Sequence, residues 1–241
     1  MKIPIGRFNE AQKSEQLYWE QRRQEISSET YRNIKRSASL EILNELRMTT
    51  NDGCLKYILE VGGAGDPMVE YFQNDFGIVI DPLARFFKTE LLPEQLASVE
   101  YYSGIGEKLP FKSASFDGVL LYNCIDHGIA PFDILTESSR VLRKGGALHI
   151  LVDTYSLLSN MYRMAVEKVL PARRCEEHPH GLRFSAVANH IKSLGFVEVK
   201  DCHDDHPYYR FLNDPKTSKE FIRGMAKGHR KLRAFYRLER A

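Results

Sequence analysis

Short apolar runs alternate regularly with helical stretches through the middle of this chain. The apolar runs predict five strands, at residues 56–61, 77–81, 99–104, 116–123 and 147–153. Stretches with helical spacing of apolar residues follow four of them, at residues 66–75, 82–92, 131–146 and 156–170. Because a helical crossover returns the chain to the same end of a sheet, this alternation predicts a parallel sheet covered on both faces.

Other patterns flank this alternating core. Two helices are expected at residues 10–26 and 27–48, and "TTNDG" at residues 49–53 ends the second. Beyond Pro171 the pattern loosens into a helix at 184–196, a strand at 197–202 and a further strand at 207–212, expected to pair antiparallel as an appended edge. We therefore divide the chain into an N-terminal helical lid (1–52), a core (53–170) and a C-terminal part that completes the sheet and the substrate side (171–241), all within one structural domain.

Composition argues against a dedicated nucleic-acid binder. The 241 residues include 34 basic and 32 acidic side chains, a net charge of +2, and 43% are hydrophobic, enough for a sizeable core. Residues 216–240 are locally basic. A solvated helix face is the preferred interpretation of this tail, and a patch that binds phosphate or RNA is the alternative.

Cysteine usage and apolar content indicate where such a chain resides. The cysteines Cys54, Cys124, Cys175 and Cys202 are widely spaced and form no CxxC pair, which is typical of a reducing compartment. The first sixteen residues lack the apolar run of a signal peptide. No stretch approaches the roughly 20 apolar residues that span a bilayer. The expectation is a cytoplasmic protein without a membrane partner.

A glycine-rich segment, "GGAGD", follows the first predicted strand. Backbone without side chains lets a ligand approach closely, and the helix expected after Asp66 would offer free N–H groups to an anion. The second strand ends at Asp81, about twenty residues after Glu60, where an acid can accept hydrogen bonds from a ribose. The alternatives are a tight turn without a ligand and an Asp81 that only caps the next helix.

Residues 57–153 resemble the class I S-adenosylmethionine-dependent methyltransferases, in particular their small-molecule branch. "ILEVGGAGD" resembles the glycine-rich first motif of that family and "GIVIDPLA" its acidic second motif. The combination of "GEKLPFKSASFDGVLLYN" with "LTESSRVLRKGGALHI" is more specific than a glycine loop alone. The resemblance implies an α/β fold: a Rossmann-like, doubly wound, mostly parallel sheet with an antiparallel edge strand, an N-terminal helical lid and a C-terminal extension.

The same resemblance implies S-adenosyl-L-methionine as cofactor and assigns its contacts. Glu60 would face the amino group, the glycine loop would pass beneath the methionine, Asp81 would hold the ribose and Asn123 would offer its backbone to the amine. The full implied set is Glu60, Gly62, Gly63, Ala64, Gly65, Asp81, Pro82, Ile105, Gly106, Glu107 and Asn123. The chain departs from the family at Ala64, Asp66 and Ile105, so Glu107 becomes the expected polar contact near the adenosine. NAD is the rival cofactor, but the loop lacks the last glycine of GxGxxG.

Candidates for the chemistry follow the fourth strand. Asp126 and His127 lie where the methyl group should emerge, and a histidine suits removal of a proton from a hydroxyl or amine. His127 could instead cap a helix or bond a carbonyl group. The expected substrate contacts are His180 and Arg183, from the resemblance, and Tyr18 and Tyr31 of the lid.

Histidines cluster in two later segments, with His178 and His180 in one and His203 and His206 in the other. They could bind a divalent metal, but their spacing matches no fixed motif, so solvated loops are the preferred interpretation and no metal is expected.

These observations predict methyl transfer to an oxygen or nitrogen of a small polar acceptor, such as a sugar or a related metabolite. One alternative is a catalytically retired protein that binds S-adenosylmethionine or regulates. The other is an RNA or protein methyltransferase, which the basic tail motivates. The acceptor itself and the oligomeric state do not follow from the sequence.

Overall fold

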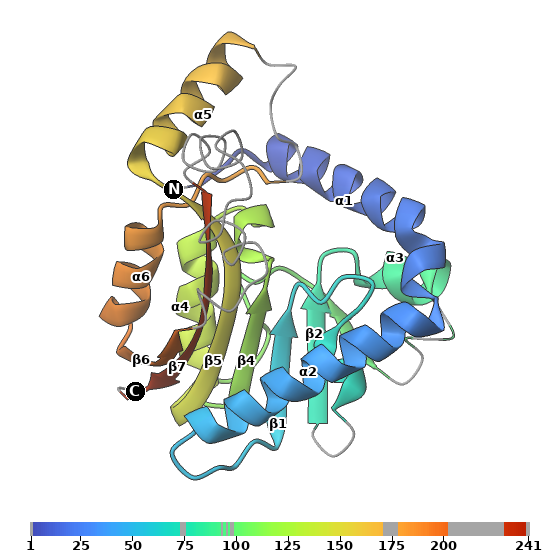
Figure 1. Ribbon diagram of the computed structural model, residues 1–241, viewed down its shortest axis with the longest axis vertical. Coiled ribbons are helices and arrows are strands. Elements are labelled where there is room, and N and C mark those ends of the chain that lie inside the picture. The colour runs from blue at the N-terminus through green and yellow to red at the C-terminus, as the bar shows by residue number, and fades with distance from the viewer. Residues whose placement is uncertain are drawn as a thin grey trace, which may run out of the picture.

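The computed structural model describes residues 2–72, 76–92, 94, 96, 99–170, 178–201 and 229–239. Its strands are β1 Tyr57–Val61, β2 Phe76–Asp81, β3 Glu100–Ser103, β4 Phe116–Tyr122, β5 Leu142–Tyr155, β6 Phe196–Asp201 and β7 His229–Leu238. They form one seven-stranded sheet in the order β3-β2-β1-β4-β5-β7-β6 (Figure 1).

Strands β1 to β5 are all parallel. The order reverses between β1 and β4: the chain proceeds from β1 through β2 to β3 on one side, and then crosses to β4 and β5 on the other. Val61, at the end of β1, is paired with both Ile80 and Leu121. The carboxyl ends of β1, β2 and β4 therefore meet at the switch point where ligands bind in open α/β sheets.

The one antiparallel strand of the described sheet is β7, which pairs with β5 on one side and with the edge strand β6 on the other. The mostly parallel, Rossmann-like class is thus confirmed, with its antiparallel strand one position inside the edge. The strand expected at 207–212 lies outside the described residues.

The prediction of a helix in the basic tail is wrong for residues 229–238, which form strand β7. Leu232, Ala234, Tyr236 and Leu238 alternate along β7 and are buried in one core cluster, while Phe235 is buried in the cluster on the other face. A period of two with both faces covered produces a strand.

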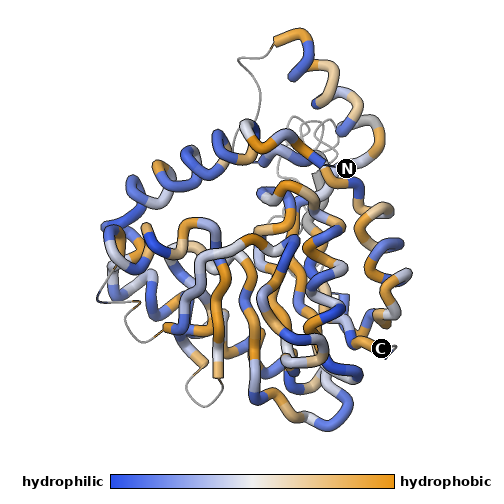
Figure 2. The backbone as a smooth tube through the Cα atoms, turned by 180° about the vertical axis from the view of Figure 1, so that it is seen from behind, coloured by the Kyte–Doolittle hydropathy of each residue, from blue (hydrophilic) through white to orange (hydrophobic). Residues whose placement is uncertain are grey.

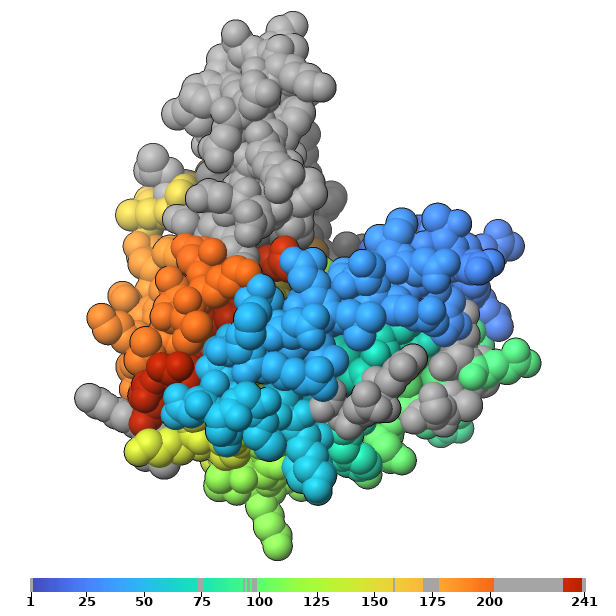
Figure 3. All heavy atoms as spheres, turned by 60° about the horizontal axis from the view of Figure 1, so that its bottom comes forward, coloured from blue at the N-terminus to red at the C-terminus, as the bar shows by residue number. Residues whose placement is uncertain are grey.

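Helices cover both faces of the sheet (Figures 1 and 2). The helical elements are α1 Ile5–Ile26, α2 Glu29–Thr49, η1 Met68–Tyr71, α3 Ala84–Phe86, η2 Phe87–Leu91, η3 Ile125–His127, α4 Pro131–Val141, α5 Leu157–Val169 and α6 Phe184–Ser193. On one face α2 buries Ile42, Leu43 and Leu46 against the strands, and it stretches across that face in Figure 3. On the other face α4 and α6 pack together with the strands in the second core cluster. None of the helices in the described ranges is both long and apolar enough to cross a membrane.

Three predicted helices differ from the structure. The one expected at 66–75 is a single 3-10 turn, η1, and the one at 82–92 divides into α3 and the π-helical η2. The one expected to reach Gly146 ends at Val141, because Leu142 already pairs with Phe116 as the first residue of β5. Gly145, with a φ of 77°, then lies inside the strand segment rather than after a helix.

Candidate active site

Two adjoining cavities lie at the carboxyl ends of β1, β2 and β4, and together we call them the cleft. The first, of about 70 Å³, is lined by Val61, Asp81, Pro82, Ile105, Gly106 and Glu107, among others. The second, of about 440 Å³, is lined by Glu60, the glycine loop, His178 and side chains of α1 and α2. Both share Glu15, Gly62, Ala64, Asn123 and His127, so these five residues mark their junction.

The glycine loop follows β1 with unusual backbone angles. Gly62 and Ala64 both have positive φ, 70° and 51°, and both line the two cavities. A Cβ on Gly62 would lie 2.5 Å from Cβ of Cys124, and one on Gly65 would lie 2.9 Å from the buried ring of Trp19. Gly62 and Gly65 therefore both leave room for protein side chains, and Gly62 and Ala64 also line the cleft.

Asp81, at the end of β2, is buried in the wall of the first cavity. Its Oδ1 accepts a hydrogen bond from the N–H of Leu83 at 2.7 Å, and its Oδ2 accepts one from the N–H of Ala64 at 3.2 Å. Burial raises the pKa of Asp81 to about 6, against the lowering effect of these two bonds. Asp81 thus caps the turn after β2, as the alternative interpretation held, and also fixes the glycine loop.

Glu60 is buried in the wall of the second cavity, where its Oε2 accepts the N–H of Val69 at 3.0 Å. Burial raises the pKa of Glu60 to about 7, although Lys35 opposes the shift. The Nζ of Lys35 lies 2.9 Å from Oδ2 of Asp66, and the hydroxyl of Tyr31 donates to the same oxygen. Helix α2 therefore holds the segment that follows the glycine loop.

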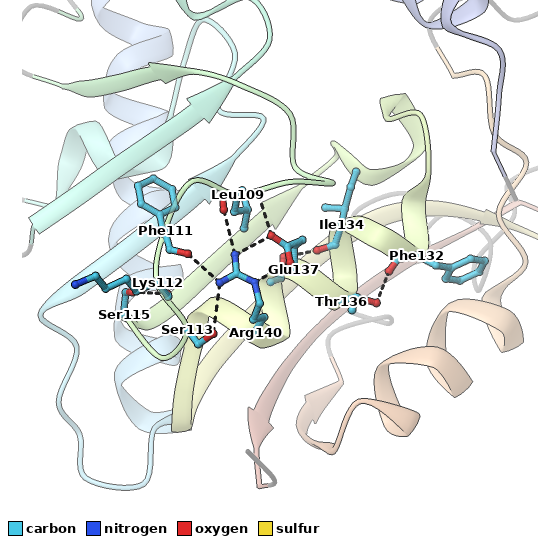
Figure 4. A network of polar contacts seen from close by, with 11 residues as sticks. Leu109, Phe111, Lys112, Ser113, Ser115, Phe132, Ile134, Thr136, Glu137 and Arg140 are labelled. Carbon is cyan, nitrogen blue, oxygen red and sulfur yellow. Dashed lines mark hydrogen bonds and ion pairs between the residues drawn. The ribbon is translucent and has the colours of Figure 1, made fainter.

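The loop that carries Ile105, Gly106 and Glu107 is fastened to α4 (Figure 4). Arg140 donates from Nη1 to the carbonyl oxygen of Phe111 at 2.8 Å and from Nη2 to that of Leu109 at 3.1 Å. Its Nε donates to Oε1 of Glu137 at 2.7 Å, and Oε2 of Glu137 accepts the N–H of Leu109 at 2.9 Å. The "LPF" and "RVL" motifs are therefore linked by direct contact.

Glu107 lines the first cavity, but its Oε1 is already engaged by protein. It accepts the N–H groups of Ile129 at 2.6 Å and Ala130 at 3.0 Å, at the start of α4. Glu107 therefore joins the loop after β3 to the segment after β4. Neither this role nor the hydrogen bond that the hydroxyl of Tyr101 donates to the carbonyl oxygen of Ala64 is visible in the sequence.

Asn123 lies at the junction of the cavities and has a φ of 52°. Its N–H donates to the carbonyl oxygen of Leu151 at 2.7 Å. Its Oδ1 is buried and has no hydrogen-bond partner within the described residues. Buried polar atoms normally have a partner, so this acceptor fits a donor on a bound molecule.

The structure brings Asp126 and His127, both in η3, together with His178. Oδ2 of Asp126 lies 2.7 Å from Nδ1 of His178, and its Oδ1 lies 3.9 Å from Nε2 of His127. Burial lowers the pKa of His178, but the carboxylate of Asp126 outweighs it and the net shift is upward. His178 is therefore not in a solvated loop, as the sequence analysis preferred, but paired with a buried acid.

The expected substrate contacts divide into two groups. Tyr18 and Tyr31 line the second cavity. His180 and Arg183 line neither cavity. His180 is buried with its Nε2 2.9 Å from the carbonyl oxygen of Gly128, and burial lowers its pKa, while Arg183 is exposed at the start of α6. His203 and His206 lie outside the described residues.

Comparisons with known proteins agree with this arrangement. A family model described as a methyltransferase domain matches residues 59–150. An uncharacterised protein of Methanocaldococcus jannaschii is 31% identical over 136 residues, which are 52% of this chain and 64% of that relative's length.

Two solved structures illustrate the likeness of the fold. Geranyl diphosphate C-methyltransferase from Streptomyces coelicolor A3(2), solved with Mg²⁺, geranyl diphosphate and S-adenosylhomocysteine, has a TM-score of 0.60 and 11% identity over 84% of this chain and 79% of its own. Phosphoethanolamine N-methyltransferase 2 from Haemonchus contortus, solved with phosphomonomethylethanolamine and S-adenosylhomocysteine, has a TM-score of 0.55 and 16% identity over 85% of this chain and 53% of its own. At these identities the likeness establishes the fold alone.

Proposed function

This chain carries a methyltransferase domain at residues 59–150, and we propose that it is a class I S-adenosylmethionine-dependent methyltransferase that methylates an oxygen or nitrogen of a small polar acceptor. The observation that carries the proposal is the junction of the cleft. Gly62, Ala64 and Asn123 border both cavities there, beside His127 and Glu15. Two adjoining cavities with a histidine at their junction suit transfer of a group from a molecule in one to a molecule in the other.

The first cavity would hold the adenosine of S-adenosyl-L-methionine. Asp81 would accept hydrogen bonds from the ribose hydroxyls, since each carboxylate oxygen can accept more than the one backbone bond it has. Ile105 and Gly106 would flank the adenine. Glu60, the glycine loop and Oδ1 of Asn123 would lie against the methionine part.

The cofactor supplies a methyl group on a sulfonium sulfur that is its own leaving group, so the chain must position the acceptor and remove a proton. Nε2 of His127 has no partner within the described residues, while its Nδ1 lies 3.5 Å from Oε2 of Glu15. A neutral imidazole with its proton on Nδ1 would take the proton of the acceptor on Nε2. Asp126 and Glu15 would stabilise the resulting imidazolium.

The second cavity favours a polar acceptor. Tyr18, Arg22 and Tyr31 offer hydroxyl and guanidinium groups from α1 and α2, and His178 offers an imidazole. A sugar hydroxyl is one acceptor that this lining suits.

Calorimetry with S-adenosylhomocysteine tests the cofactor site. The variant Asp81→Asn should bind it about tenfold more weakly, because one hydrogen bond to a charged acceptor is lost. The control Asp52→Asn removes a carboxylate that precedes β1, at the opposite end of the sheet, and should bind normally. Since burial raises the pKa of Asp81 to about 6, wild-type affinity should fall as the pH is lowered through 6, and Asp81→Asn should lack that step. Equal affinity of Asp81→Asn and wild type at neutral pH would remove the ribose assignment.

The acceptor is tested separately with S-adenosylmethionine labelled in its methyl group. Transfer of label to a sugar or small amine supports the proposal. Transfer only to RNA or protein would establish the rival substrate class, and cofactor binding without transfer to any acceptor would favour a retired enzyme.

A further inference from the structure

Three side chains that can bind a metal converge at one end of the second cavity. Asp126 and His127 come from η3, just after β4, and His178 comes from the segment before α6. One ligand atom from each lies within 4.8 Å of the other two. His127 and His178 line the cavity, and Asp126 is 1% exposed behind them.

Two polar atoms of this cluster face each other with no hydrogen-bond donor between them. Oδ1 of Asp126 and Nε2 of His127 are both buried, are 3.9 Å apart and have no hydrogen-bond partner in the described part of the chain. Glu15, 3.5 Å from Nδ1 of His127, favours the tautomer with its proton on Nδ1. Nε2 is then an acceptor that faces a carboxylate oxygen. Burying two acceptors against each other is costly unless a proton, a water or a cation lies between them.

We propose that Asp126, His127 and His178 bind a divalent transition-metal ion. Imidazole nitrogens with one carboxylate suit Zn²⁺, Fe²⁺ and neighbouring ions better than Mg²⁺, which prefers oxygen. Three protein ligands leave coordination positions open, as in catalytic rather than structural sites. His178 would exchange its 2.7 Å contact with Asp126 for the ion.

Glu15 completes the site from helix α1 without ligating the ion. A metal-bound histidine usually donates its other N–H to a carboxylate, which orients the ring and strengthens the ligand. The pairing of Glu15 with Nδ1 of His127 has this arrangement.

His127 and His178 both line the second cavity, so an ion that they hold would be within reach of oxygen atoms of an acceptor bound there. This role rests on the proposed methyl transfer. An acceptor with two adjacent oxygens, such as a vicinal diol or a hydroxy acid, could chelate the ion. With the ion bound, Nε2 of His127 is a ligand, and the ion rather than the imidazole would make the hydroxyl acidic.

Titration of the metal-free full chain with Co²⁺ tests the site, because its visible absorption reports the ligands. We expect one Co²⁺ per chain, displaced by Zn²⁺. His178→Gln and Asp126→Asn should each weaken binding at least tenfold, and Glu15→Gln about tenfold. The control His190→Gln changes a histidine on α6, whose Nε2 lies 3.2 Å from the carbonyl oxygen of Phe132, and should bind as wild type.

Binding of S-adenosylhomocysteine, measured on the same samples, separates this inference from the proposed function. A chain that binds S-adenosylhomocysteine but takes up no stoichiometric Co²⁺ would overturn the metal site and leave His127 as the base. Undiminished Co²⁺ binding by His178→Gln would overturn it as well. His178 is only half-buried, so that variant keeps the test valid if Asp126→Asn fails to fold. Tight Co²⁺ binding lost in His178→Gln, in a chain that binds no S-adenosylhomocysteine, would support the site and contradict the methyl-transfer proposal.

Discussion

The Nζ atom of Lys35 lies 2.9 Å from Oδ2 of Asp66, so an ion pair joins helix α2 to the segment that follows the glycine loop. The two side chains are only 14% and 15% exposed. Burial lowers the pKa of Lys35, but Asp66 and Glu60 outweigh this effect and the net shift is upward, so the lysine stays charged. Lys35, some thirty positions earlier in the chain, therefore helps β1 to hold the glycine loop in place.

Replacing Lys35 by Met should lower the free energy of unfolding by about 3 kcal/mol, because Asp66 would keep a largely buried charge without its partner. Urea denaturation would measure the change, with Lys192→Met on the exposed side of α6 as the matched control. The double variant Lys35→Met/Asp66→Asn should regain more than half of the loss. Purely additive effects of the two substitutions would contradict this account.

Gly62→Ala should be more damaging than Gly53→Ala, although both glycines have nearly the same backbone angle. Their φ values are 70° and 68°, so each alanine would be strained by about 1 kcal/mol or more. A Cβ on Gly53 meets nothing within 4 Å, whereas one on Gly62 would lie 2.5 Å from Cβ of Cys124. Overpacking should add about 1–3 kcal/mol and displace the loop.

Thermal unfolding and calorimetry with S-adenosylhomocysteine would compare the two glycine variants. We expect Gly53→Ala to bind normally and Gly62→Ala to bind poorly. Equal stability losses, with binding intact in both, would show that the contact with Cys124 does not restrict this position.

His149, in β5, should make the protein less stable in acid. Its ring is fully buried near Tyr122 and Phe235, and neither nitrogen has a hydrogen-bond partner among the described residues. Burial lowers its pKa to about 3, well below the usual value of 6.5. Between pH 6.5 and 3 the unfolded chain binds a proton that the folded chain does not, so folding stability falls as the pH falls.

The variant His149→Phe should remove this loss. The decrease in unfolding free energy from pH 7 to pH 5 should be smaller than in wild type by about 2 kcal/mol, the difference expected for one histidine excluded from protonation. Comparing two pH values cancels any packing effect of the larger ring, because that effect is the same at both. An unchanged pH dependence would mean that His149 can bind a proton in the folded state.

Local pattern was sufficient to predict much of the cofactor side. Each of the five strands expected in the core overlaps a strand of the sheet, because a buried parallel strand needs a continuous apolar run, which is visible in the residues themselves. The glycine loop and Asp81 follow directly from those strands, and the structure places both at the edge of one cavity. The carboxyl ends of parallel strands lie at the same edge of the sheet. The residues that follow neighbouring strands therefore come close together there.

Contacts between segments that are far apart in the sequence could not be predicted from local pattern. The helix expected after Asp66 is a short turn in which Glu60 accepts the N–H of Val69, and β7 is a strand because the core covers both of its faces. His178 pairs with Asp126 across 52 residues of sequence.

Local pattern therefore indicated the five parallel strands, the glycine-rich loop after β1 and the acid after β2, all of which depend on residues close together in the chain. The tertiary structure alone decided that β7 enters between β5 and β6, that Lys35 and Tyr31 hold Asp66, and that two histidines and two acids surround one point of the cleft. The physical reason is that burial, ion pairing and the pKa of a side chain depend on its neighbours in space, and folding selects those neighbours from segments that no local periodicity connects.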